Sequence, residues 1–379
     1  MSSGHDEQLP RKRQRTDERE EGSSGKQELQ RDKVVWYEDG NIVVRAGPGC
    51  AGEGAVYGFK CHQSILASRS KVFETMLQLP NSGGPAVDGI PTVDFPDPWE
   101  DVRDFLRMMY GALEIPPERR AQNSVSAIAG ALRLAAKYDV PDMAQQLRRR
   151  LAYDYPNWFF DWVEVEDERY MLSHHRAEEQ MLEDYPEMYF DINLCTPEPA
   201  SVVRLVQDIR AGTALRAAWY ELSRSYVHGR LPFKNPDTFP PPENWVERRE
   251  ADLALLEPRD MKRLLLGRER LRDMARRAIS TIRVDGHFAE GGRPPCKSCK
   301  EQPEACLRRF MSSEDFWDLA TDPMGGLLQL RREVKRYVCD QCKFSANDAI
   351  MSACLDIWES LVEIFELRDL GIELYIDPV

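Results

Sequence analysis

The sequence predicts an α+β unit followed by a mostly α-helical region. Within residues 34–152, short β-branched runs come first, and segments with apolar residues at helical spacing follow them, which is the order typical of an α+β domain. Beyond residue 153 the apolar spacing is helical almost throughout. The 379 residues allow about two domains of ordinary size plus tails.

The composition is that of a globular chain with net negative charge. Hydrophobic residues make up 42% and charged residues 30%, which suffices for real cores. The 51 basic and 64 acidic side chains give a net charge of −13, which argues against the whole chain wrapping a nucleic acid. No apolar run predicts a membrane span or a secretory signal. Nine cysteines, an odd number, and the lack of N-x-S/T sequons favour an intracellular compartment.

Residues 1–30 predict a disordered tail, because they are almost wholly polar and cannot bury enough apolar surface to offset ordering entropy. Four basic residues fall within five positions, a spacing that suits the acidic groove of a nuclear import receptor: Arg11, Lys12, Arg13 and Arg15. Acidic residues follow at once, so a charge-balanced solvated tail is the alternative. The sequence therefore favours the nucleus over the cytoplasm.

The strands of the first unit are expected from about Val34. The β-branched run 41–45 and the segment 56–60 predict a hairpin, and the glycines between them predict a long loop. Residues 91–95 supply another short strand. The sequence thus indicates a small sheet at the start of the unit.

Helices follow these strands. Apolar residues fall on one face from Ser64 to Leu77, and a second helix opens after Pro98. Two more helices are expected over 125–136 and 143–151. The strands and helices together fill residues 34–152.

Four segments of this unit resemble BTB/POZ domains. They are Phe59, His62, Leu66, Ser70 and Phe73 in an F-x-x-H-x-x-x-L-x-x-x-S-x-x-F pattern, the opening strand 39–44, the helix 102–111 ending in Tyr-Gly, and the L-x-x-A-x-x-Y-x-V helix 132–140. The resemblance implies a small sheet capped by helices, used for protein–protein contact and often for self-association. It implies no catalysis.

The resemblance also gives roles to individual residues. The implied core or interface residues are Asp39, His62, Gln63, Leu66, Phe73, Tyr110 and Tyr138. His62 is expected to be structural and to pair with Asp39. The glycine-rich loop and the helical ending are similar to BTB proteins of mushroom-type fungi, whose helical tail has no assigned activity.

Three departures from the family pattern bear on partners. Gln63 stands where corepressor-binding members commonly carry a basic residue, which argues against that partner. Little apolar sequence precedes Asp39, which argues against a strand-swapped dimer. No glutamate lies between Glu74 and Glu100, so the hydrophobic-x-Glu motif of cullin-binding members is missing. A substrate adaptor of a cullin-type ubiquitin ligase stays an alternative.

The region 153–379 is expected to begin with an acidic, linker-like segment over 161–191. Helical spacing returns from Val202, and residues 251–283 predict one or two helices interrupted near Gly267. Two further helices are expected over 313–337 and 346–366.

Residues 259–283 carry nine Arg or Lys side chains against three acids. Charges such as Arg268, Arg270, Arg276 and Arg277 allow a nucleic-acid or acidic-partner surface, and hence a chromatin-associated regulator, as an alternative function. No DNA-reading motif accompanies them, so nucleic-acid binding is the minor alternative. The simpler interpretation is the solvated face of a helix that complements the acidic segment 161–191 within the same chain.

The cysteine-rich segment 296–342 holds two C-x-x-C pairs: Cys296 with Cys299, and Cys339 with Cys342. Four thiolates suit one tetrahedral structural zinc. The pairs are 39 residues apart, where ribbon-type sites use about 15–20. Small apolar residues on packed helices are therefore the alternative.

No catalytic constellation emerges from the sequence. The glycines at 47, 49 and 52 satisfy G-x-G-x-x-G, but a strand-like segment follows where a dinucleotide site needs a helix N-terminus. Neither H-E-x-x-H nor G-x-S-x-G occurs. The sequence therefore predicts a protein-binding scaffold acting in nuclear regulation, without enzymatic activity or a certain cofactor.

Overall fold

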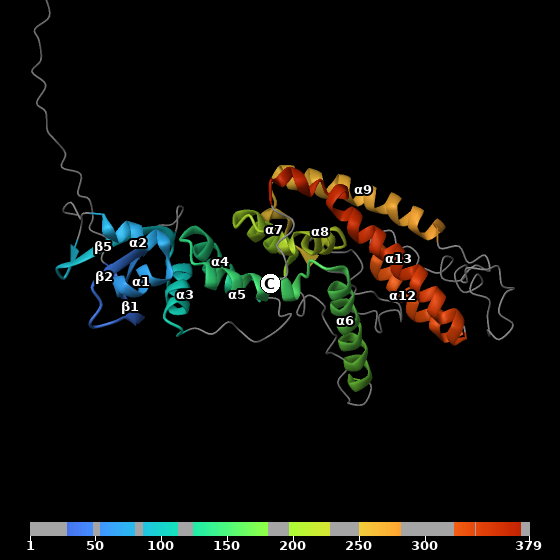
Figure 1. Cartoon of the computed structure of the whole chain (residues 1–379), viewed down its shortest axis with the longest axis horizontal. Helices are drawn as coiled ribbons and strands as arrows, with labels where there is room; N and C mark the ends of the chain where they lie inside the picture. The colour runs from blue at the N-terminus through green and yellow to red at the C-terminus, as the bar shows by residue number, and fades with distance from the viewer. Residues whose placement is uncertain are drawn as a thin grey trace, which may run out of the picture.

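The computed structural model describes residues 29–47, 54–79, 86–112, 124–180, 197–227, 250–281, 322–337 and 339–372. Figure 1 shows the sheet and α1–α3 at one end, α4 and α5 in the middle, and the remaining helices at the other end. This arrangement confirms the predicted α+β unit followed by a helical region. Among the helices in these ranges, none combines the length and apolar character that crossing a bilayer requires.

The first unit contains a five-stranded sheet in the order β1–β3–β2–β5–β4. Its strands are β1 (Leu29–Trp36), β2 (Ile42–Gly47), β3 (Val56–Cys61), β4 (Ala86–Val87) and β5 (Ile90–Pro98). The predicted hairpin is present, since β2 and β3 pair antiparallel with Val44 opposite Phe59. β1 adds parallel to β3, and β5 adds parallel to β2.

β1 corrects two predictions about where order begins. The strand starts at Leu29, so a tail over 1–30 is wrong for its last two residues, and an ordered start near Val34 is too late. The strand is interrupted by a bulge in which the buried carboxylate of Asp32 accepts hydrogen bonds from the N–H groups of Val34 and Val35. These bonds satisfy a carboxylate that burial would otherwise destabilise.

β4 and β5 form a second hairpin that was not predicted from the sequence. Asp88 and Gly89 join the strands, and both have positive φ, at 52° and 76°. A two-residue turn with positive φ at both positions matches the right-handed twist of the strands, and Asp-Gly is the preferred sequence for it.

Five helices complete the unit: α1 (Gln63–Arg69), α2 (Lys71–Gln78), α3 (Trp99–Met109), α4 (Ser126–Lys137) and α5 (Pro141–Asp154). The helical segment expected from Ser64 to Leu77 is split at Ser70. The backbone of Ser70 is extended, and its hydroxyl accepts a hydrogen bond from the Phe73 N–H, which caps α2.

The two parts of the chain share one continuous hydrophobic core. α4 packs on α3 and also on α7. The hydroxyl of Tyr155 donates to the carbonyl of Pro197 at 2.6 Å, and Arg133 pairs with Asp208 at 2.8 Å. The helical region is therefore packed directly against the first unit.

The helical region contains α6 (Phe159–Gln180), α7 (Pro199–Asp208), α8 (Leu215–Ser223), α9 (Pro258–Thr281), α12 (Pro323–Tyr337) and α13 (Asp340–Ile364). Short 3-10 turns lie at Gly212–Ala214, Leu253–Leu255 and Leu367–Leu370, and Tyr226–Val227 pairs with Glu250–Ala251. The helices predicted over 313–337 and 346–366 correspond to α12 and α13, and residues 313–321 of the first range lie outside the described residues.

The prediction of a linker-like segment over 161–191 is wrong for residues 161–180, which belong to α6. Trp162, Val165 and Arg169 are buried on one side of this helix. An acidic composition misleads here because buried apolar side chains occupy the inner face of the helix while the exposed acids Asp161, Glu164 and Glu168 lie outside.

The prediction of a break near Gly267 is also wrong, because α9 continues through it. A Cβ atom at this position would lie 2.2 Å from the Cδ1 and Cε1 atoms of Phe365. Gly267 therefore marks a close approach between α9 and the end of α13, and its role is in packing.

Candidate functional site

Three of the predicted motif residues form the interior of the first unit. Leu66 and Phe73 are fully buried, and the ring of Phe73 stacks on that of Tyr138 with centroids 5.0 Å apart. The Tyr138 hydroxyl donates to Asp97 at 3.1 Å, and its carbonyl accepts a hydrogen bond from Ser70. Burial and the neighbouring carboxylate of Asp97 raise the pKa of Tyr138.

Asp39, His62 and Tyr110 form a hydrogen-bonded chain at the surface of the same unit. Nε2 of His62 lies 3.1 Å from Oδ1 of Asp39, the pairing that the sequence analysis expects. Nδ1 of His62 lies 2.9 Å from the Tyr110 hydroxyl, which also accepts the His62 N–H. When Nε2–H donates to the carboxylate, neutral His62 accepts the Tyr110 proton at Nδ1. The hydrogen bond from His62 lowers the pKa of Asp39.

Two further residues adjoin this hydrogen-bonded chain, Tyr37 beside it and the buried Cys61 below it, and the motif did not identify them. The ring of Tyr37 stacks on Tyr110 with centroids 4.4 Å apart. Cys61 lies beneath, where burial raises its pKa to about 12 and keeps the thiol protonated and unreactive at neutral pH. This environment favours a structural role for His62.

Gln63 is engaged in fold contacts. Its N–H donates to Oδ1 of Asn41 at 2.8 Å, and its side-chain amide donates to the Asn41 carbonyl at 3.2 Å. These bonds join the start of α1 to the start of β2. Asn41 is a second residue that the motif did not point to.

An apolar stripe lies on the outer side of α2, beside the buried motif residue Phe73. Val72 and Leu79 are exposed, and Met76 between them is partly buried. Val72 and Met76 lie one turn apart on the same face of α2, and Leu79 is the C-cap residue that directly follows the helix. We call these residues the α2 stripe. It has the apolar character that protein–protein contacts bury.

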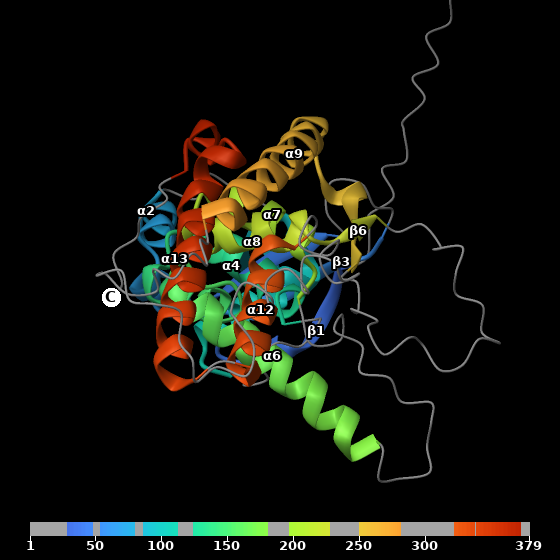
Figure 2. The same cartoon turned by 90° about the vertical axis from the view of Figure 1, so that its right-hand side faces the viewer.

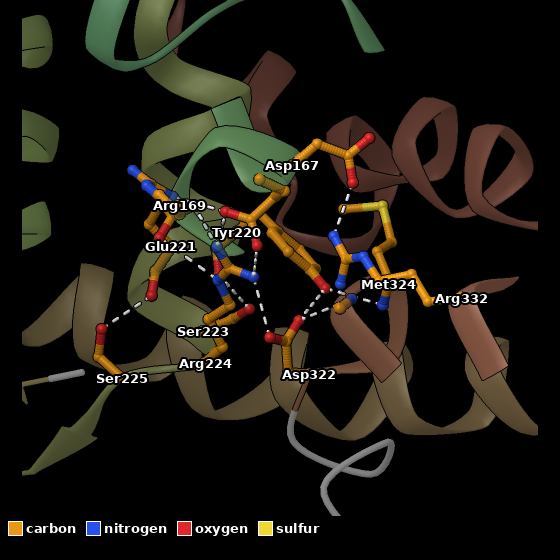
Figure 3. Close-up of polar contacts among 12 residues, drawn as sticks. Asp167, Arg169, Tyr220, Glu221, Ser223, Arg224, Ser225, Asp322, Met324 and Arg332 are labelled. Atoms are coloured by element: carbon orange, nitrogen blue, oxygen red, sulfur yellow. Dashed lines mark hydrogen bonds and ion pairs between the residues drawn. The ribbon is translucent and has the colours of Figure 1, made fainter. Parts of the chain in front are cut away.

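The helical region holds a buried ionic cluster that no motif predicted (Figure 3). The guanidinium of Arg224 is 1% exposed and contacts Glu166 at 2.7 Å, Glu221 at 2.7 Å and Asp322 at 2.9 Å. Arg169 adds contacts to Glu166 and Glu221. The cluster thus joins α6, α8 and the residue before α12.

The electrostatics of the cluster depend on all of its members. Burial alone would lower the pKa of Arg224, but Asp322 and Glu166 raise it above its ordinary value, so the cation is retained. The Tyr220 hydroxyl donates to Asp322 at 2.6 Å and accepts the Met324 N–H. Burial raises the pKa of Tyr220. This arrangement fits a structural clamp between helices.

Two of the four arginines named for a nucleic-acid surface, Arg268 and Arg270, form contacts within the chain. Arg268 donates to the carbonyls of Leu222, Ser223 and Ser225, and Arg270 pairs with Glu366 at 2.6 Å. Arg276 and Arg277 remain exposed, although Arg276 lies 3.4 Å from Asp273. Within α6, Glu166 pairs with Arg224 and Asp167 pairs with Arg331 and Arg332, and residues 181–191 of the acidic segment lie outside the described residues.

Of the four predicted zinc ligands, two lie within the described residues. Cys339 is the N-cap residue of α13, and Cys342 lies in its first turn, whereas Cys296 and Cys299 lie outside the described residues, as do Arg11, Lys12, Arg13 and Arg15. No cluster of three or more potential metal ligands occurs in the described part of the chain. The zinc site stays a prediction.

Metal content tests this prediction. Chain purified without chelator should contain about one zinc, because two C-x-x-C pairs supply four thiolates. Replacing Cys296 and Cys299 by serine should remove the metal, whereas replacing the buried Cys61 by serine should leave it in place. Plasma emission spectroscopy measures the stoichiometry. Zinc-free wild-type protein with unchanged helicity and melting temperature would contradict a structural site.

Comparison with known families bears on the first unit alone. Residues 55–154 match the BTB/POZ domain model. No curated protein and no solved structure matches the chain. The resemblance to the BTB proteins of mushroom-type fungi thus stays a prediction. The matched range runs from β3 to the end of α5 and includes His62, Phe73, Tyr110 and Tyr138. The N-terminal unit is therefore a BTB/POZ domain, a class of domain that generally mediates protein–protein interaction and is generally non-enzymatic.

Proposed function

We propose that this chain is a non-catalytic interaction scaffold whose BTB/POZ domain binds partner proteins through the α2 stripe. The observation that carries the proposal is the exposure of Val72 on α2 and of Leu79 directly after it, on an element whose inner face is fixed by the buried Phe73. A rigid helix with exposed apolar side chains loses little conformational entropy on binding.

The helical region supports this function because it is held in a fixed position relative to the BTB/POZ domain. The shared core and the Tyr155–Pro197 hydrogen bond tie it to the domain, so a partner on α2 and a partner on the distal helices would keep a fixed spacing. Nuclear regulation is the setting that the basic run at residues 11–15 favours. A cullin-adaptor role is the alternative.

Affinity purification of the tagged full-length chain, followed by mass spectrometry, tests the proposal. The wild type should recover specific partners, and Val72→Glu with Leu79→Glu should lower their recovery about tenfold or more, because two carboxylates would be desolvated in the contact. Both positions are exposed, so the melting temperature should stay within a few degrees. Gln78→Glu adds charge on the same helix outside the stripe and should leave recovery unchanged.

The identity of the recovered proteins separates the alternatives. A cullin that is lost with the stripe variant would support the adaptor role. Nuclear proteins without a cullin would support a regulatory scaffold. Equal recovery by the wild type and the stripe variant would refute the α2 stripe as the binding surface.

A further inference from the structure

We propose that the outward face of α9 binds an acidic segment of a partner protein that also carries apolar residues. The contact is separate from the α2 stripe and does not depend on it. It follows from a pair of exposed leucines that lies among cations without partners.

α9 buries one face and exposes the opposite one. Leu264 and Leu271 are buried, and the helix packs against α8 and α13. Lys262 and Glu269, which precede these leucines by two positions, are exposed. Two positions correspond to about 200° around a helix, so Lys262 and Glu269 mark the centre of the outward face. Figures 1 and 2 both place α9 at the outer edge of the helical region.

Two exposed leucines lie in the middle of this face. Leu265 is 56% exposed and Leu266 is 36% exposed. They follow Lys262 by three and four residues, so they lie one turn from it, on either side of the line to Glu269. Exposed apolar side chains rimmed by charge are typical of interaction sites.

The charge around the leucines is mainly positive. Arg259 and Lys262 are exposed on their N-terminal side and Arg272 on their C-terminal side, and none of the three has a hydrogen bond or an ion pair within the described part of the chain. Arg270 is paired with Glu366. Glu269 is the one exposed acid between positions 259 and 272, so an excess of positive charge surrounds the leucines.

The acids of α9 argue against a nucleic acid or an anionic bilayer as the partner. Glu269 and Asp273 are exposed one turn apart along the outward face, where a continuous array of phosphates would meet their carboxylates. Phosphate contacts also need cations but not exposed aliphatic side chains. The net charge of −13 further repels a polyanion.

A protein segment can match this pattern because its charges are discrete. Carboxylates on the segment would face Arg259, Lys262 and Arg272, and apolar side chains between them would cover the two leucines. From Lys262 to Arg272 the face extends roughly 15 Å, which is the length of about three helical turns. An acidic helix with apolar residues near its middle therefore fits the face.

Photo-cross-linking of the tagged full-length chain in its native cells tests the chemistry of the partner. Leu265→p-benzoylphenylalanine places a photoreactive ketone among the cations. On irradiation the ketone inserts into a C–H bond of the partner, so that this bond breaks and a C–C and an O–H bond form. We expect adducts with peptides of another protein in which Asp and Glu outnumber Lys and Arg.

Two controls make this result specific. Adding Lys262→Glu and Arg272→Glu should abolish the acidic adducts, because like charges would then face each other. The same ketone at the exposed Phe344 of α13 should not form them. Adducts with nucleic acid, with lipid or with a second copy of this chain would overturn the proposal, as would a lack of adducts beyond the Phe344 control.

A synthetic probe gives an independent test by fluorescence anisotropy. The probe is a labelled, alanine-rich helical peptide with glutamates near both ends and two leucines between them. Lys262→Glu with Arg272→Glu should weaken its binding to the full-length chain about tenfold or more, and Leu265→Ser with Leu266→Ser should also weaken it. Arg149→Glu reverses an exposed cation of α5 and should leave binding unchanged.

Exchanging the charges of the probe completes this test. A probe with lysines in place of its glutamates should bind the charge-reversed variant and not the wild type, because opposite charges meet only in that variant. Absence of binding between the acidic probe and the wild type would contradict the proposal. Binding that does not respond to the two leucine substitutions would contradict it as well.

The outcome is distinguishable from that of the proposed function. The variant with Val72→Glu and Leu79→Glu should lose the partners of the α2 stripe and keep the acidic adducts at position 265. Reversing the charges of α9 should have the opposite effect. Loss of both sets of partners in either variant would show that the two surfaces are not separate.

Discussion

Replacing Gly267 by valine should destabilise the chain by about 2–3 kcal/mol, because the new side chain overpacks a filled interior. The first added carbon alone would lie 2.2 Å from two ring atoms of Phe365. That ring is fully buried and lies against Trp219 with centroids 5.6 Å apart, so it has no open side to move into. Thermal unfolding should show a fall of roughly 5–10 °C in melting temperature.

A double-mutant cycle separates this clash from a change in helix propensity. Phe365→Leu removes the ring edge, so the loss in the double variant should be smaller than the sum of the single losses by about 1 kcal/mol or more. Glu269→Val introduces the same residue at an exposed position of α9 and should cost only a few tenths of a kcal/mol. Additive losses in the cycle would show that the Gly267–Phe365 contact is not the cause.

The case of Gly267 illustrates what sequence patterns leave open. Glycine lowers helix propensity, so the sequence predicts a break in the helix at Gly267. The structure keeps the helix because Phe365, almost a hundred residues further along the chain, needs the space that a missing side chain provides. Local propensity is outweighed by a packing constraint that no local window contains.

The BTB/POZ core was predictable because its signals are local. The apolar residues Leu66 on α1 and Phe73 on α2 are buried, as is Ser70, which lies between the two helices and caps α2. The hairpin of β2 and β3 follows from two β-branched runs and the glycines between them. Both signals lie within about twenty residues of sequence.

β1 escaped prediction because its bulge removes the alternation that marks a strand. Of its eight residues only Asp32 and Val35 are buried, and one of them is a carboxylate. The ionic cluster around Arg224 was not predicted for a different reason. Arg224 lies 58 residues from Glu166 and 98 residues from Asp322, so only the folded chain brings them together.

Replacing Arg224 by methionine should have the largest effect of any single substitution in the helical region. Removing one member of a buried ion cluster leaves the others desolvated without compensation, which typically costs about 3–5 kcal/mol. Here Glu166, Glu221 and Asp322 lose a shared cation, and only Arg169 remains beside the two glutamates. Arg149→Met removes an exposed cation of α5 and should change the free energy of unfolding by less than about 0.5 kcal/mol.

The pH dependence of this loss in the free energy of unfolding identifies the cause of the loss. In the variant, a buried carboxylate such as Glu221 should have a folded-state pKa above its unfolded value of about 4.3. Between these two pKa values the folded state binds the extra proton, so folding becomes more favourable as the pH falls. The deficit relative to the wild type should therefore be smaller at about pH 5 than at about pH 8 in urea unfolding. A deficit that is equal at both pH values would indicate lost packing, since methionine would then have left no uncompensated charge behind.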